Sequence, residues 1–107
     1  MATVTRGLPD DVVMRVKAVL DEYESRYPGA TAELYRQNPA SIRIKIVDDR
    51  FAGRPKGQRH DEVWDFLAAR LNEDDMQDIS VLLPLATSDL RSSLMNLEFE
   101  HPTDSKL

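Results

Sequence analysis

The chain has 107 residues, of which 14 are Lys or Arg and 19 are Asp or Glu, and it contains no cysteine. A length of this order fits one domain, and the lack of cysteine excludes disulfide scaffolds, thiol nucleophiles and zinc or iron–sulfur sites built from this chain's own thiolates. The formal charge of −5 excludes a protein whose whole surface binds nucleic acid or anionic lipid, and because no apolar run approaches the ~18 residues of a membrane helix, we expect a cytoplasmic protein without a membrane segment.

The first predicted element is an amphipathic helix that starts soon after Leu8 and ends at Pro28-Gly29. Pro9 suits its first turn, and apolar side chains recur at the three- and four-residue spacing of one helix face. These side chains are Val12, Val13, Val16, Val19, Leu20, Tyr23 and Tyr27. Residues 1–7 show no such period, so we expect a flexible N-terminal arm there.

A β-hairpin is predicted next, with strands over residues 31–37 and 42–46. The connection 38–41 reads Asn-Pro-Ala-Ser, which is typical of a turn. Two strands across so short a connection pair in antiparallel fashion. In the second strand, isoleucines alternate with Arg43 and Lys45. This alternation predicts that the isoleucines face the core and that the two cations face outward.

A second helix is predicted over about residues 59–71, after a loop over residues 48–58 that holds two glycines and a proline. Its core-facing side chains are Val63, Trp64, Leu67 and Leu71. The polar run 72–75 is expected to be a connection, and the apolar run 79–83 to be a third strand. Pro84 near its end indicates an edge or a terminus. Because a helix between two strands implies a crossover, the third strand should run parallel to its neighbour.

The order of these elements is α-β-β-α-β, which predicts an α+β fold with a three-stranded mixed sheet packed by two main helices. This single domain is expected to cover residues 8–100. Residues 87–89 are predicted to cap a last short helix that runs through Met95. The alternation over residues 97–100 leaves strand and coil open. Residues 101–107 are expected to form a tail.

Positive charge is concentrated between residues 43 and 59, where the net charge is +4 against −9 for the rest of the chain. The six cations are Arg43, Lys45, Arg50, Arg54, Lys56 and Arg59. The run from Gly53 to Gly57, followed by a helix start, can present backbone amides and cations to a phosphate or another anion. The alternative interpretation is that these are ordinary solvated cations on a hairpin and a loop.

His60 is the candidate metal ligand that stands out, because it is predicted to begin a helix directly after the loop. A neutral imidazole nitrogen is a suitable ligand for iron or zinc. The alternative is a polar residue tucked against Trp64, four residues further along the helix. The sequence has no Gly-x-Ser-x-Gly elbow and no recognisable pair of catalytic carboxylates, so we do not expect an enzyme.

The spacing from Phe51 to Gly53, the Arg59-His60 pair, and the Leu-containing helix and strand that follow resemble the BolA family. The resemblance extends over about residues 12–90 and implies a fold similar to a class II KH domain. It implies a protein partner rather than a reaction. BolA-like proteins bind monothiol glutaredoxins and can share an iron–sulfur cluster with them, using the His that opens the helix, which by position is His60.

The resulting hypothesis is a BolA-like protein-interaction module that has no cofactor of its own but shares an iron–sulfur cluster with a monothiol glutaredoxin through His60. Partner or anion contacts are expected from Arg50, Phe51, Gly53, Arg54, Lys56 and Arg59. The family's second ligand comes from the turn that corresponds to residues 38–41, which here holds neither His nor Cys. The thiols of any cluster would therefore come from the partner.

Two alternatives stay open: nucleic-acid or anion binding through residues 43–59, and an adaptor domain with no intrinsic chemistry. Binding of nucleic acid by the second helix itself is disfavoured, because Asp61, Glu62 and Asp65 follow His60 and would repel phosphates.

Overall fold

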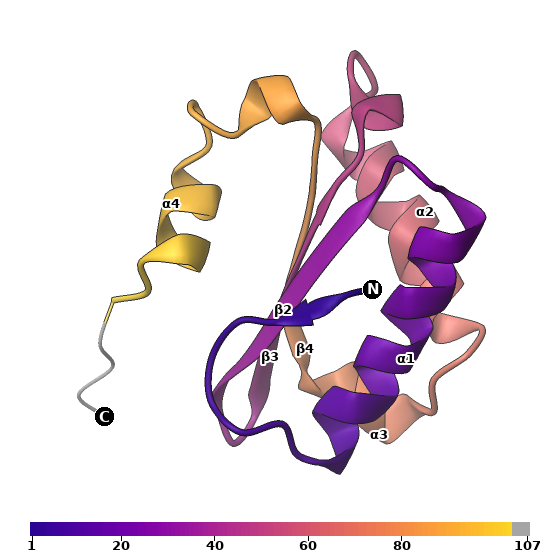
Figure 1. The fold of residues 1–107 in the computed structure, drawn as a ribbon, viewed down its shortest axis with the longest axis vertical. Helices are drawn as coiled ribbons and strands as arrows, with labels where there is room; N and C mark the ends of the chain where they lie inside the picture. Colours follow the sequence, from indigo (N-terminus) through magenta and orange to yellow (C-terminus); the bar gives the residue numbers. More distant parts are fainter. Residues whose placement is uncertain (104–107) are drawn as a thin grey trace.

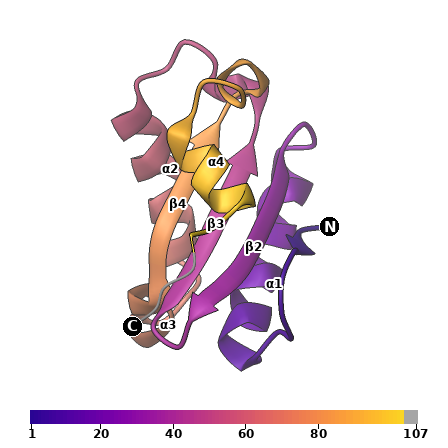
Figure 2. The same cartoon turned by 90° about the vertical axis from the view of Figure 1, so that its left-hand side faces the viewer.

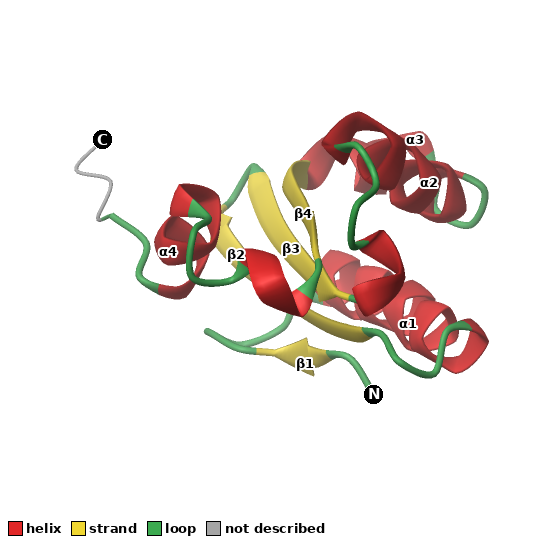
Figure 3. Cartoon of the chain, turned by 90° about the horizontal axis from the view of Figure 1, so that it is seen from above, coloured by secondary structure: helices red, strands yellow, loops and turns green. Residues whose placement is uncertain are grey.

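The computed structural model describes residues 1–103 and has the α+β class that the sequence predicts. A central sheet is covered on one face by α1 and α2, with α3 beside them, and on the other face by the short helix α4 (Figures 1 and 3). We call these the inner and the outer face. The elements are β1 (Thr3–Val4), α1 (Asp11–Arg26), β2 (Thr31–Asn38), β3 (Ser41–Val47), the 3-10 turn η1 (Asp49–Phe51), α2 (Lys56–Ala68), α3 (Glu73–Asp78), β4 (Ile79–Leu85), the 3-10 turn η2 (Thr87–Asp89) and α4 (Leu94–Glu100).

The sheet has the strand order β1-β2-β3-β4. The antiparallel pairing of β2 with β3 confirms the predicted hairpin, and the parallel pairing of β3 with β4 confirms the predicted crossover through α2. As Pro84 indicates, β4 lies at an edge of the sheet.

The predicted number of three strands is wrong, because β1 adds a fourth strand where the sequence predicts a flexible arm. Thr3 pairs with Glu33 in parallel register, and the amide of Thr5 donates to the carbonyl of Leu34 at 3.0 Å. Ala2 is buried, and its amide donates to a carboxylate oxygen of Asp21 at 2.6 Å. A strand of two residues is too short to show a period, which is why the pattern does not reveal it.

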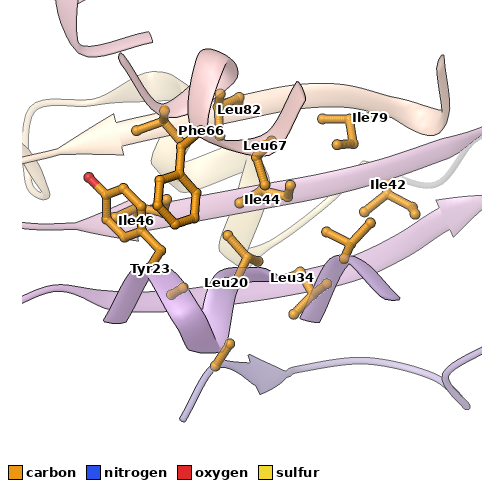
Figure 4. Close-up of a cluster of buried hydrophobic side chains, with 14 of the residues drawn as sticks. Leu20, Tyr23, Leu34, Ile42, Ile44, Ile46, Phe66, Leu67, Ile79 and Leu82 are labelled. Atoms are coloured by element: carbon orange, nitrogen blue, oxygen red, sulfur yellow. The ribbon is translucent and has the colours of Figure 1, made fainter. Parts of the chain in front are cut away.

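The inner face holds the main hydrophobic core. Side chains of α1 and α2 meet those of β2, β3 and β4 across this face, and Figure 4 shows their close packing. The buried members of this core include Val13, Val16, Leu20, Tyr23, Leu34, Ile42, Ile44, Ile46, Val63, Phe66 and Leu67. The predicted core faces of the first helix and of the isoleucine strand are therefore confirmed.

The starts of two helices differ from the prediction. Pro55 occupies the N-cap position of α2, so this helix begins at Lys56, and His60 lies in its second turn rather than at its start. The residues predicted to be a connection form α3. Its N-cap, Asn72, accepts from the amide of Asp75 at 2.8 Å, and its three first-turn acids favour a helix N-terminus.

The outer face is covered by α4, which lies across the sheet in Figure 2. The predicted helix from residue 87 through Met95 is in fact two elements, η2 and α4, and the second of these contains Leu97 to Glu100. Lys45, predicted to face solvent, is only 4% exposed because α4 covers it. Residues 101–103 follow without regular structure, and the rest of the predicted tail lies outside the described residues.

Candidate interaction surface

The loop before α2 is built largely from residues that the sequence marks as candidate contacts. Phe51 is fully buried in the core, and Gly53 has a φ of +75°, a conformation that favours glycine. Arg59 is also buried, and its guanidinium donates to the carbonyl of Arg54 at 2.9 Å and to Asp89 at 2.8 Å. Phe51 and Arg59 therefore shape the loop from within, because their side chains are buried, whereas Gly53 is exposed and sets the backbone of the turn.

Asp89, which lies in η2 directly after β4, is the carboxylate partner of Arg59. One of its carboxylate oxygens accepts from the amide of Ala86 at 2.9 Å as well as from Arg59. The amide of Ala86 and the Arg59 guanidinium hold the pKa of Asp89 below its ordinary value. The pair ties η2 to the loop before α2.

Most cations of the basic segment are engaged within the chain. Arg50 pairs with buried Asp48 at 2.9 Å and lies over the ring of Tyr27, 3.8 Å from its centroid. Arg54 pairs with Glu62 at 3.3 Å. Within residues 1–103, Lys56 is the one cation of the six without a carboxylate within 4.0 Å. An anion bound to this segment would have to compete with the protein's own carboxylates.

His60 is accessible, with 46% of its side chain exposed. Its ring stacks on Trp64 at a centroid distance of 5.8 Å and an interplanar angle of 12°, so the residue both contacts Trp64 and remains open to a partner. Its Nδ1 lies 3.9 Å from a carboxylate oxygen of Asp61. Residues 1–103 contain no group of three or more His, Cys, Asp or Glu side chains that could hold a metal. The described part of the chain therefore supplies no complete ligand set, and His60 is a single potential ligand.

An open hollow of about 590 Å³ begins at Trp64 and lies between α2 and α3. It is lined by Trp64, Ala68, Leu71, Glu73, Met76, Gln77 and Ile79. Trp64 and Leu71 are only partly buried at the margin of the core, although the helix period predicts core positions for both. The spacing of apolar residues identifies which face of α2 is turned toward the core, but it does not show where that face extends beyond the edge of the sheet. We call His60 together with the residues that line this hollow the α2–α3 surface.

Comparisons with protein-family models, with curated proteins and with solved structures find no match for this chain. Within the part of the chain that the structure describes, no helix has the length and apolar character needed to cross a bilayer.

Proposed function

We propose that this chain is a small protein-interaction module that docks a partner on the α2–α3 surface. The observation that carries the proposal is the stack of exposed His60 on Trp64, which continues into an open hollow lined mainly by apolar side chains. A partly buried tryptophan beside a hollow is typical of the anchor residues that dominate protein–protein binding energy. The exposed acids Asp61 and Asp65 beside this surface disfavour a phosphate backbone as the ligand.

The partner that we propose is a monothiol glutaredoxin, as the resemblance to the BolA family implies. In this proposal His60 contributes one ligand to an iron–sulfur cluster whose thiolate ligands belong to the partner. The accessible ring of His60 supports that role, and the absence of cysteine requires the thiols to come from elsewhere. The apolar hollow would hold the partner, so binding does not depend on the cluster alone.

The test is to titrate the full chain with a monothiol glutaredoxin, with and without its cluster, by calorimetry and visible circular dichroism. Trp64→Ala should weaken binding of both forms by about 30-fold, since a tryptophan anchor contributes about 2 kcal/mol. His60→Ala should abolish the change in the visible spectrum and keep binding of the cluster-free form. His101→Ala, which removes the chain's other histidine, is the matched control and should behave as wild type.

The outcomes separate the two parts of the proposal. If the wild-type chain binds neither form of the glutaredoxin, this partner is wrong. If binding occurs and the visible spectrum of the cluster stays unchanged, the chain is an adaptor and the role of His60 as a ligand is wrong.

A further inference from the structure

The outer face of the sheet carries a buried lysine whose closest partners lie outside the sheet. Lys45 lies on the central strand β3, and its ammonium donates to Asn96 at 2.8 Å and to Glu100 at 3.1 Å, both on α4. Glu33 on β2 lies further away, at 3.8 Å. Burial of an ammonium group is costly unless it is paired and hydrogen-bonded. The partners that compensate this burial come mainly from α4.

Arg43 and Tyr35, on the same face of the sheet as Lys45, make further contacts with α4. Arg43 pairs with Glu98 at 3.3 Å, and the hydroxyl of Tyr35 donates to the backbone carbonyl of Phe99 at 2.8 Å. The Phe99 ring lies 4.9 Å from that of Tyr35, measured between centroids. The apolar cluster around it consists of Tyr35, Leu83, Leu85, Phe99 and, partly buried, Leu90. The outer face thus recognises two acids, an aromatic ring and a terminal helix carbonyl.

Helix α4 fits this face incompletely. It has seven residues, of which only Asn96 and Phe99 are buried, and Leu94 is 82% exposed. A helix of this length is not stable by itself, so its structure depends on docking. In addition, Nε of Arg43 is buried without a hydrogen-bond partner among the described residues. A carboxylate placed for a bidentate contact would satisfy this donor, whereas Glu98 bonds only to Nη1.

We propose that the outer face is a binding site for an acidic helical segment of a partner protein, and that α4 is the built-in occupant which this segment replaces. The segment has an aromatic residue flanked by two acids, as Glu98, Phe99 and Glu100 are in α4. The site lies on the opposite face of the sheet from the helices that form the α2–α3 surface, so it does not depend on the function proposed above. A peptide is favoured over nucleic acid because Tyr35 binds a helix carbonyl and because Glu33, beside Lys45, would repel phosphates.

The experiment measures binding of a labelled peptide of residues 90–103 to full-length chains by fluorescence anisotropy. In the Glu98→Lys/Glu100→Lys chain, reversed charges on half-exposed side chains should release α4 without touching the core. This chain should bind the peptide about tenfold more tightly than wild type, because the competing helix is removed. Asp61→Lys/Asp65→Lys makes the same change in net charge on α2 and should bind as wild type does.

Two further variants test the contacts themselves. Phe99→Ala, which opens the face by a different route, should also increase peptide affinity. Adding Lys45→Met to the Glu98→Lys/Glu100→Lys chain should reverse the gain. Equal peptide affinity in wild type and both opened chains would overturn the proposal, and so would opened chains that bind a single-stranded oligonucleotide but not the peptide.

Discussion

The two faces of the sheet are built from alternate residues of the same strand, yet they are held in different ways. On the inner face, Ile42, Ile44 and Ile46 are fully buried against α1 and α2. On the outer face, Arg43 and Lys45 contact a single short helix, largely through ion pairs and hydrogen bonds. One face of a strand can therefore form the hydrophobic core, while its other face makes a smaller, polar contact that a partner's helix can replace.

The largest expected effect that tests this comparison comes from removing one apolar side chain on each face. Ile44→Ala should lower the free energy of unfolding by about 2–5 kcal/mol, because it leaves a cavity in a closed core. Phe99→Ala removes a larger side chain, but α4 can undock while the sheet stays folded, so the global loss should be smaller. Urea unfolding followed by Trp64 fluorescence measures both losses.

Hydrogen exchange provides the second measurement on the same pair of variants. Phe99→Ala should remove protection of the α4 amides while β2 and β3 remain protected, whereas Ile44→Ala should reduce protection throughout the sheet. A global loss for Phe99→Ala equal to that for Ile44→Ala would show that the outer face is as integral to the fold as the inner face.

The same contrast explains which parts of the fold the sequence predicts. The inner face follows from local periodicity, because α1 and β3 repeat their apolar residues at the spacing of a helix and a strand. The structure of the outer face does not follow from periodicity. The alternation in β3 places Lys45 on the opposite face from the isoleucines, but it cannot predict that a helix about fifty residues further along the chain covers this lysine. The strand β1 is missed for a related reason, since its pairing with β2 depends on tertiary contact rather than on a pattern.

The candidate site was predictable to a similar extent. The contact of His60 with Trp64 follows from their spacing of four residues along a helix, and the structure shows it. The exposure of His60 is expected from a position at the helix start, whereas the residue lies in the second turn of α2 and is exposed there. The roles of Phe51 and Arg59 do not follow from the sequence. Burial of Arg59 depends on Asp89, which lies thirty residues further along the chain and is brought near by the crossover to β4.

A second prediction concerns how the docking of α4 depends on pH. Thr103 and Arg43 hold the pKa of Glu98 below its ordinary value, and Lys45 does the same for Glu100. Carboxylates with a lowered folded-state pKa contribute stability that is fully present above their unfolded pKa and is lost as the pH falls through the lower folded value. Docking of α4 should therefore weaken below about pH 4, the ordinary range of a glutamate.

Exchange protection of α4 across a pH series, compared with Trp64 fluorescence from the inner side, measures this release. The charged groups around the two carboxylates are Arg43, Lys45 and His101, with Glu33 beside Lys45, while Arg6 donates to the backbone carbonyl of Glu100. Glu98→Gln/Glu100→Gln should remove the acid dependence of α4 docking. Persistence of the same acid dependence in this variant would assign it to other groups.

The smallest expected effect uses two helix caps of the same kind on opposite sides of the sheet. Ser93 caps α4 by accepting from the amide of Asn96 at 3.0 Å, and Asn72 caps α3 by accepting from the amide of Asp75 at 2.8 Å. Removing either side-chain cap by substitution with Ala should cost about 1 kcal/mol locally. Because α3 contributes Met76 to the main core, Asn72→Ala should lower the global free energy of unfolding by most of that amount. Ser93→Ala should instead reduce only the exchange protection of α4 and leave the urea midpoint within error of wild type. Equal midpoint shifts for the two variants would mean that α4 unfolds together with the core, and the outer face would then not be free to exchange its occupant.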